Sequence, residues 1–171
     1  MSCLKALQVL LVDDNQHIRT ITSAVLQSAG VLKAREASDG TAALDMLREY
    51  PIDLVIVDFN MFPMDGVEFT RLVRNSPDSV NPYLPIIMMT GHSEKARVYE
   101  ARDAGVTEFL VKPITAKAVL DRIQSVIFRP RAFVKTDGYF GPDRRRLTTP
   151  NYRGAMRRAS DQSRAPNSSA A

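Results

Sequence analysis

Three carboxylates, a hydroxyl and an ammonium follow or end short apolar runs in the first two thirds of the chain. They belong to Asp13, Asp14, Asp58, Thr90 and Lys112. Carboxylates that converge on one pocket repel each other, and they stay ionised only beside a cation or by taking up protons. Oxygen donors favour a hard cation, and an open cluster that keeps several waters suits Mg²⁺. These residue types therefore predict magnesium-assisted phosphoryl transfer.

In such a reaction each side chain has a separate role. The Asp58 carboxylate attacks phosphorus while the divalent ion orients and neutralises the incoming group. Lys112 pairs with one phosphoryl oxygen, and the Thr90 hydroxyl donates a hydrogen bond to another.

Simpler structural roles exist for most of these residues. Asp14 or Asn15 is a suitable N-cap for the helix that follows, and capping explains the Asp13-Asp14 pair well when it is taken alone. Thr90-Gly91 and Lys112-Pro113 are ordinary residues for the end of a strand. Asp58 is harder to explain in this way, because it follows a very apolar run and no helix begins at once. Together, the residues favour the chemical interpretation.

Short apolar runs alternate with segments of helical periodicity along residues 1 to 128. The runs are Leu7 to Val12, Ile52 to Val57, Ile86 to Met89 and Val106 to Val111, with a weaker one at Ala34 to Ala37. They are almost unbroken, as in strands that are covered on both faces. Five such units in sequence predict an α/β fold with a five-stranded, parallel, doubly wound sheet. In this architecture ligands bind beyond the carboxyl ends of the strands, where the reactive residues follow their runs.

Length and composition limit the protein class. The chain has 171 residues and a mass of 19.0 kDa, which suits one ordinary domain and a short appendage. The single cysteine, Cys3, excludes an internal disulfide framework and a multi-cysteine zinc site, as expected in a reducing compartment. No apolar run has the length of a membrane span, and the apolar start lacks a signal-peptide cleavage site. We interpret that start as a buried strand.

Charge divides the chain at Phe128. Residues 1–128 hold 13 basic and 16 acidic residues, a net charge of −3, and residues 129–171 hold 10 and 3, a net charge of +7. The tail has four prolines and three aliphatic residues, so we predict that most of it is disordered. Its basic band consists of Arg144, Arg145, Arg146, Arg153, Arg157 and Arg158. The band is interpreted as a solvated appendage, a contact for an acidic protein surface or a non-specific nucleic-acid contact.

Five motifs occur in a specific order: VLLVDDN at 9–15, LVIVDFNM at 54–61, MDG at 64–66, MMTG at 88–91 and FLVKP at 109–113. With them, residues 5–128 resemble the receiver domain of two-component response regulators, a bacterial phosphorelay family with a flavodoxin-like fold. The resemblance implies these site residues: the phosphoacceptor Asp58; the Mg²⁺ ligands Asp13, Asp14, Asp58 and the Asn60 backbone carbonyl; the phosphoryl contacts Thr90 and Lys112; and the switch aromatic Phe109, which turns inward when Thr90 moves.

The resemblance also implies a function. We expect a stand-alone, cytoplasmic receiver that accepts a phosphoryl group from a histidine kinase or a histidine phosphotransfer protein. It would signal through phosphorylation-dependent contact with an output protein that the sequence does not identify. Asn60 and His92 are similar to the family's variable positions beside the attacking water, so we expect them to tune the lifetime of the phosphoryl group. The tail segment YFGPDRRR is similar to tail motifs of alphaproteobacterial receivers and has no assigned role.

The sequence departs from the family pattern at one position. The family usually places proline directly after the residue that corresponds to Met61, whereas here Phe62 comes first and the proline is Pro63. Since proline fixes φ and phenylalanine does not, the sequence does not determine the backbone conformation at Met61 and Phe62. Phe62 is interpreted either as a partner contact or as a residue buried in the loop.

Three other functions share parts of this residue set. A phosphatase of the haloacid-dehalogenase type needs a second aspartate two residues after the nucleophile, where this chain has Asn60, which cannot serve as a general acid. The chain is therefore expected to store the phosphoryl group, with slow autodephosphorylation, and not to act as an enzyme. A nucleic-acid-binding protein would act through the tail without sequence specificity. A degenerate receiver is disfavoured, because all of the acid-pocket positions are filled.

Overall fold

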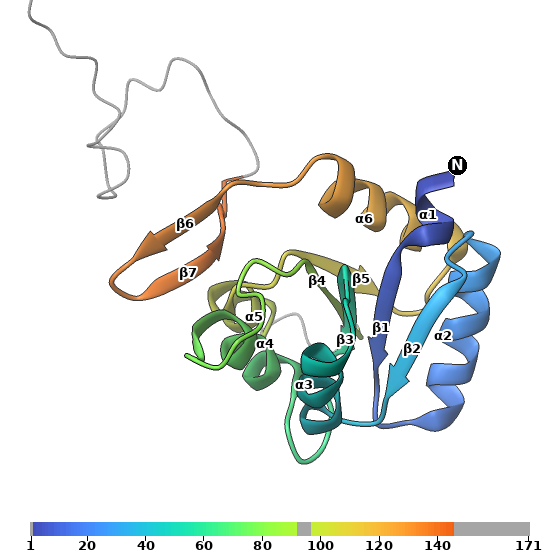
Figure 1. Cartoon of the computed structure of the whole chain (residues 1–171), viewed down its shortest axis with the longest axis horizontal. Coiled ribbons are helices and arrows are strands. Elements are labelled where there is room, and N and C mark those ends of the chain that lie inside the picture. The colour runs from blue at the N-terminus through green and yellow to red at the C-terminus, as the bar shows by residue number, and fades with distance from the viewer. Residues whose placement is uncertain (1, 92–96, 146–171) are drawn as a thin grey trace, which may run out of the picture.

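The computed structural model describes residues 2–91 and 97–145, and its central feature is one parallel sheet. The sheet has five strands in the order β2-β1-β3-β4-β5 (Figure 1). These strands are β1 (Gln8–Val12), β2 (Lys33–Ala37), β3 (Leu54–Asp58), β4 (Ile86–Thr90) and β5 (Glu108–Val111). The predicted five-stranded parallel sheet is confirmed, and Asp58 and Thr90 are the last residues of their strands.

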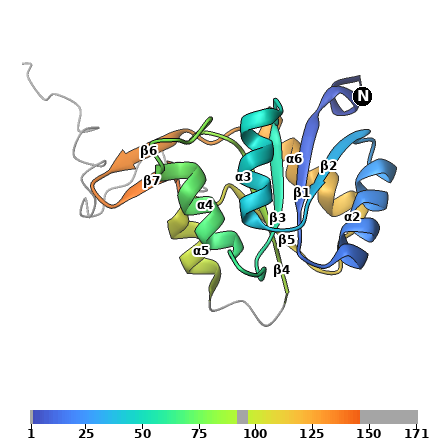
Figure 2. The same ribbon diagram turned by 60° about the horizontal axis from the view of Figure 1, so that its bottom comes forward.

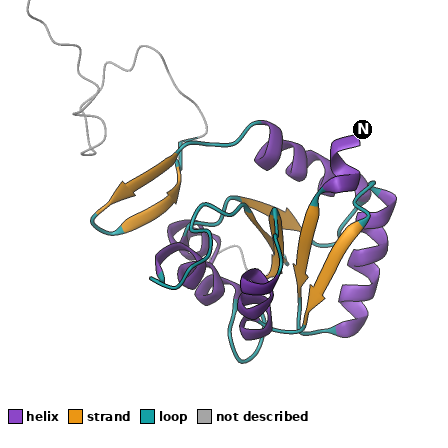
Figure 3. Ribbon diagram, viewed as in Figure 1, coloured by secondary structure: helices purple, strands orange, loops and turns teal. Residues whose placement is uncertain are grey.

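Helices cover both faces of the sheet (Figure 3). They are α1 (Ser2–Ala6), α2 (Gln16–Ser28), α3 (Gly40–Glu49), α4 (Gly66–Asn75), α5 (Val98–Ala104) and α6 (Ala116–Phe128). The buried residues of α2 and α6 pack on one face, and those of α3, α4 and α5 pack on the other. The arrangement is therefore doubly wound, as the alternation of strands and helices predicts.

Burial explains why some strands are easier to predict than others. Every residue of β3 and β4 is buried, which produces an unbroken apolar run that ends in a polar residue. The edge strand β2 is different, because Lys33, Arg35 and Glu36 are exposed. This exposure is the physical reason for the weak apolar signal at Ala34 to Ala37.

The predicted N-terminal strand at Leu7 to Val12 is confirmed as β1, which begins one residue later, at Gln8. Residues 2–6 form the short helix α1, which was not predicted. Leu7 is buried and Leu4 packs against the same core cluster as α2 and α6. The apolar residues thus reach the core from two different elements.

The C-terminal tail contains an element that was not predicted. Strands β6 (Phe133–Thr136) and β7 (Tyr139–Pro142) form an antiparallel hairpin beside α4 and α5 (Figures 1 and 2). Residues 133–142 therefore depart from the predicted disorder and extend the ordered chain beyond the predicted boundary at Phe128. Disorder was predicted because the tail has few aliphatic residues. The hairpin packs through aromatic residues instead, including the buried Tyr139. Residues 146–171 lie outside the described residues.

Within residues 2–91 and 97–145, no helix combines the length and the apolar character needed to cross a bilayer.

Candidate functional site

The predicted site residues come from the carboxyl ends of four strands, β1, β3, β4 and β5, which are neighbours in the sheet. Asp13 follows β1, Asp58 ends β3, Thr90 ends β4 and Lys112 follows β5. Parallel pairing puts Val12 beside Val57, Asp58 beside Met89 and Thr90 beside Val111, so these ends lie at one edge. We call this edge, with Asp13, Asp14, Asp58, Thr90 and Lys112, the acid edge.

Lys112 is the centre of the acid edge. Its Nζ donates a hydrogen bond to Asp58 Oδ1 over 2.6 Å and lies 3.7 Å from Asp13 Oδ2. The backbone N–H of Lys112 donates to the Thr90 carbonyl over 2.8 Å, which fixes the point where β5 leaves the sheet. One ammonium thus faces two carboxylates from two different strands.

Local hydrogen bonds hold the two N-terminal carboxylates in place. Asn15 is the N-cap of α2 and accepts from the amides of His17 and Ile18, so neither aspartate is needed as the cap. Asp13 Oδ1 accepts from the Asn15 amide over 2.9 Å, and Asp14 Oδ2 accepts from the Phe62 amide over 3.2 Å. The capping alternative is therefore satisfied by Asn15, which leaves both carboxylates available.

Burial and charge act against each other on Asp58, which is 7% exposed. Burial raises the pKa of the Asp58 carboxyl above its ordinary value, and the neighbouring Asp13 carboxylate adds to the rise. The Lys112 ammonium lowers the pKa of Asp58 and so opposes that rise. The site therefore holds a desolvated carboxylate whose ionised form depends on nearby positive charge.

One oxygen at the acid edge lacks a hydrogen bond. Asp13 Oδ2 is buried and accepts no hydrogen bond within the described part of the chain, although the Lys112 ammonium lies 3.7 Å from it. A buried, unsatisfied carboxylate oxygen is costly, and a hard cation is a suitable partner for it. In the described residues, no group of three carboxylate, imidazole or thiolate side chains is arranged to hold a metal. The donor set thus fits a cation that takes part of its shell from backbone oxygen and water, as Mg²⁺ commonly does.

The loop after β3 presents two adjacent residues very differently. Met61 is buried, whereas the Phe62 side chain is 82% exposed. Burial of Phe62 in the loop, one of the two sequence interpretations, is therefore wrong. Farther along the loop, Gly66 lies so close to the Asp58 carbonyl that a Cβ there would approach its oxygen to 2.4 Å. This contact gives a physical reason for the glycine in the MDG motif.

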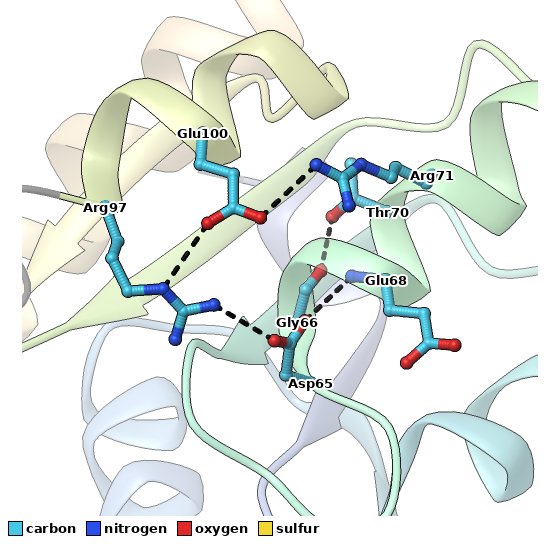
Figure 4. Close-up of polar contacts among 7 residues, drawn as sticks. All are labelled: Asp65, Gly66, Glu68, Thr70, Arg71, Arg97 and Glu100. Carbon is cyan, nitrogen blue, oxygen red and sulfur yellow. Dashed lines mark hydrogen bonds and ion pairs between the residues drawn. The ribbon is translucent and has the colours of Figure 1, made fainter.

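A polar network beside the acid edge was missed by the sequence analysis. Asp65 caps α4 and accepts a hydrogen bond from Arg97, just before α5, over 3.2 Å (Figure 4). Arg97 also contacts Glu100, and Glu100 accepts from Arg71 of α4. The Arg97 guanidinium lies 4.6 Å from the centre of the Phe59 ring. The network therefore links the loop after Asp58 to the start of α5, and its only local signal was the D-x-x-E pattern at 65–68.

Two further predicted positions lie on β4 and β5. The Thr90 residue is 3% exposed, and Phe109 is half-buried against the core beneath α3, α4 and α5. Phe109 also lines a groove of about 350 Å³ together with Tyr99. The carbonyl of Phe109 accepts from Arg122 Nε over 2.8 Å, which ties β5 to α6.

The remaining predicted residues are not part of the acid edge as described. Asn60 is exposed in the loop after β3. Arg144 pairs with Asp103 over 2.6 Å, so the start of the basic band contacts the folded domain. The Arg145 amide donates locally to Asp143. The predictions for His92, Arg146, Arg153, Arg157 and Arg158 fall outside the described residues.

Comparisons with known proteins agree with this geometry. A family model, the response regulator receiver domain, matches residues 9–124. Chemotaxis protein CheY of Pseudomonas aeruginosa is 35% identical over 123 residues, which cover 72% of this chain and 98% of that protein. CheY-3 of Vibrio cholerae is 33% identical over 125 residues, covering 73% and 95%. This chain belongs to the response regulator receiver family of two-component systems.

Solved structures give the same result. Chemotaxis protein CheY4 of Vibrio cholerae is similar at a TM-score of 0.64 and 36% identity, covering 71% of this chain and 98% of that one. The receiver domain of a sensor histidine kinase from Pseudomonas aeruginosa, solved with a magnesium ion coordinated in its active site cleft, has a TM-score of 0.61 and 25% identity. That alignment covers 69% of this chain and 94% of the other.

Proposed function

We propose that this chain is a stand-alone phosphorylation switch in which Asp58 accepts a phosphoryl group from a histidine kinase or a histidine phosphotransfer protein in the cytoplasm. The observation that carries the proposal is the contact of the Lys112 ammonium with Asp58 at 2.6 Å, beside the unsatisfied Asp13 Oδ2. A buried carboxylate nucleophile, an adjacent ammonium and a second carboxylate that can bind a cation are groups that phosphoryl transfer to a side chain uses.

In the transfer step an Asp58 oxygen attacks phosphorus and the bond from phosphorus to the donor's histidine nitrogen breaks. The ionised form of Asp58 is the nucleophile, and Lys112 favours that form against the effect of burial. After transfer, Lys112 pairs with a phosphoryl oxygen and the Thr90 hydroxyl donates to another. Two strand ends thereby contact one new group.

A magnesium ion, when bound, supplies the positive charge that offsets the carboxylates and the incoming phosphoryl oxygens. Asp13, Asp14 and Asp58 would hold it, together with the backbone carbonyl of Asn60. The unsatisfied oxygen of Asp13 supports this choice.

The phosphoryl group is expected to be stored and not rapidly hydrolysed. Asn60, two residues after Asp58, is exposed and carries an amide, which cannot act as a general acid or base. We therefore propose slow autodephosphorylation, with a lifetime set by Asn60 and His92. The output is contact with another protein, governed by Thr90 and Phe109 on adjacent strands.

The direct experiment is phosphorylation of the full chain by acetyl phosphate, followed by intact-mass measurement. The wild type should gain the mass of one phosphoryl group in Mg²⁺, and Asp58→Asn should gain none. Asp53→Asn is the matched control, because Asp53 directly precedes the same strand at the opposite edge of the sheet. Labelling of Asp58→Asn, or equal labelling of the wild type in excess chelator, contradicts the proposal.

A second variant separates acceptance of the phosphoryl group from the response. Lys112→Ala should still be phosphorylated slowly, because the Asp58 carboxylate remains, but the link between the phosphoryl group and β5 is lost. Amide chemical shifts of residues 106–112 on addition of beryllofluoride measure the response. An undiminished change in Lys112→Ala means that Lys112 is not the coupling residue.

A further inference from the structure

The β6–β7 hairpin docks on the opposite end of the sheet from the acid edge. Its two phenylalanines, Phe133 and Phe140, pack with Tyr83, which precedes β4, at ring-centre distances of 5.1 and 5.2 Å, and with each other at 5.6 Å. Tyr139 is buried, and its hydroxyl donates to the Pro142 carbonyl over 2.7 Å. The hairpin is therefore a packed part of the domain at the amino ends of β4 and β5.

Under the hairpin lies Arg74, a buried guanidinium at the end of α4. It donates to the carbonyls of Pro82 and Leu84 before β4, and to the Gly105 carbonyl and the Thr107 hydroxyl before β5. Burial lowers the pKa of Arg74 to about 10. The Phe133 ring lies 5.1 Å from the guanidinium carbon. Hairpin, α4, β4 and β5 thus meet on one buried cation.

Two glycines, Gly105 and Gly141, lie next to each other where the hairpin meets the end of α5. Gly105 ends α5 with φ of +103°, and a Cβ there would lie 2.9 Å from the Phe140 carbonyl oxygen. A Cβ on Gly141 would lie 2.7 Å from the Tyr139 hydroxyl oxygen, within the hairpin, and 2.8 Å from the Gly105 Cα. A methyl group on Gly141 therefore forces a shift in the packing of the buried Tyr139 ring, in the seat of the hairpin on Gly105, or in both.

Two arginines tie the hairpin segment to β5 and α5. Arg131 donates to the carbonyls of Thr107 and Asp143 and lies 3.8 Å from the buried Glu108 of β5. Arg144 pairs with Asp103, near the end of α5, over 2.6 Å. Both arginines line the same groove as Phe109. The hairpin segment and the switch aromatic thus share one surface.

Helix α5 and strand β5 each connect the hairpin to the acid edge. The start of α5 is tied through Arg97 to Asp65, in the loop that follows Asp58 (Figure 4), and its end lies under the hairpin at Gly105. Strand β5 starts beside Arg131 and leads into Lys112, which contacts Asp58. Helix α5 and strand β5 therefore each contact the hairpin segment at one end and are tied to the acid edge at the other.

We propose that the docked β6–β7 hairpin is a brake on the phosphorylation switch. It stabilises the arrangement of α5 and β5 in which Lys112 pairs with Asp58, and phosphorylation of Asp58 loosens the hairpin from its seat. This inference rests on the proposed phosphorylation of Asp58. Because coupling between two sites is reciprocal, loosening the hairpin must also tighten binding of a phosphoryl group at Asp58.

The first test uses the unaltered full chain with Mg²⁺ and beryllofluoride as the phosphoryl mimic. Hydrogen exchange of the amides in residues 133–142 should become at least about fivefold faster on addition of beryllofluoride. Unchanged or slower exchange there, with clear changes around Asp58 and Lys112, overturns the brake and leaves the proposed function intact. An absence of change at Asp58 and Lys112 contradicts the proposed function as well.

The second test compares two glycine variants of the same hairpin. Gly141→Ala should unseat the hairpin, whereas Gly138→Ala, where a Cβ meets nothing within 4 Å, should not. We expect the beryllofluoride Kd of Gly141→Ala to fall at least about fivefold and that of Gly138→Ala to match the wild type. Phe133→Ala is a second variant that should unseat the hairpin. Faster amide hydrogen exchange in residues 133–142 shows which variants have an unseated hairpin, and only those are compared. If the hairpin is unseated and the affinity for beryllofluoride is unchanged or weaker, the proposal is overturned. If no variant unseats the hairpin, the outcome of the first test decides.

Discussion

The two ends of the sheet balance their buried charges in different ways. At the acid edge, Asp13 and Asp58 both face the Lys112 ammonium, and Asp13 Oδ2 accepts no hydrogen bond in the described part of the chain. At the hairpin end, the Arg74 guanidinium donates to four neutral oxygens from separate segments. A saturated buried cation favours one arrangement of its surroundings, whereas an unbalanced cluster can exchange partners. The contrast indicates that the Arg74 contacts hold the fold at one end, whereas the acid edge is built to exchange partners.

The largest expected effect is at the hairpin end. Arg74→Ala should lower the free energy of unfolding by about 3 to 5 kcal/mol, because it leaves buried carbonyls without donors. Arg71→Ala, on the exposed side of the same helix, removes only a surface ion pair with Glu100 and should cost less than about 1 kcal/mol. Urea unfolding of both variants measures the difference. Equal costs would contradict the stabilising role given to the buried Arg74 guanidinium.

The next effect concerns pH and belongs to the acid edge. The folded-state pKa of Asp58 is raised, so the folded protein holds the proton more tightly than the unfolded chain does. Stability from this group is present at low pH and is lost as pH rises from the ordinary aspartate range through the raised pKa. Relative to Asp58→Asn, the wild type should therefore lose stability with increasing pH, by at most about 1.4 kcal/mol per pH unit.

Urea unfolding of these two proteins across that pH range, in the presence of a chelator, provides the measurement. The free energy of unfolding of the wild type, relative to Asp58→Asn, should fall as pH rises. A difference that stays constant with pH, or that grows in favour of the wild type as pH rises, contradicts the electrostatic description of the acid edge.

The smallest effect is expected at the exposed loop residue. Phe62→Ala should change the free energy of unfolding by less than about 0.5 kcal/mol, since the side chain is 82% exposed. Its buried neighbour offers the comparison, and Met61→Ala should cost about 2 kcal/mol. Phosphorylation by acetyl phosphate should be unaffected in Phe62→Ala. A large loss of stability there would show that the loop depends on this ring.

The acid edge was accessible to sequence reasoning because its residues are placed by local rules. Each follows or ends a short apolar run, and parallel strands bring such positions to one edge. The N-cap of α2 is Asn15 and not Asp14. Both are suitable capping residues, so only the hydrogen bonds in the structure distinguish them. The Asp65–Arg97 contact joins residues 32 positions apart and left no periodic signal.

The hairpin was missed for a physical reason as well as a compositional one. A two-residue connection, Asp137-Gly138, between β6 and β7 is a recognised hairpin signal that the charge and proline content of the tail obscured. Its seat, however, depends on Gly105 meeting Gly141 and on Arg74 meeting Phe133. Such contacts join distant parts of the chain, and no spacing within the tail reveals them.

The most direct test of the account is to locate the phosphoryl group in the wild-type full chain. After incubation with acetyl phosphate and Mg²⁺, peptide mapping by mass spectrometry should place the group on the peptide that contains Asp58 and assign it to that residue. A phosphoryl group on another side chain, or a chain that stays unmodified while Mg²⁺ is bound, would contradict the central claim.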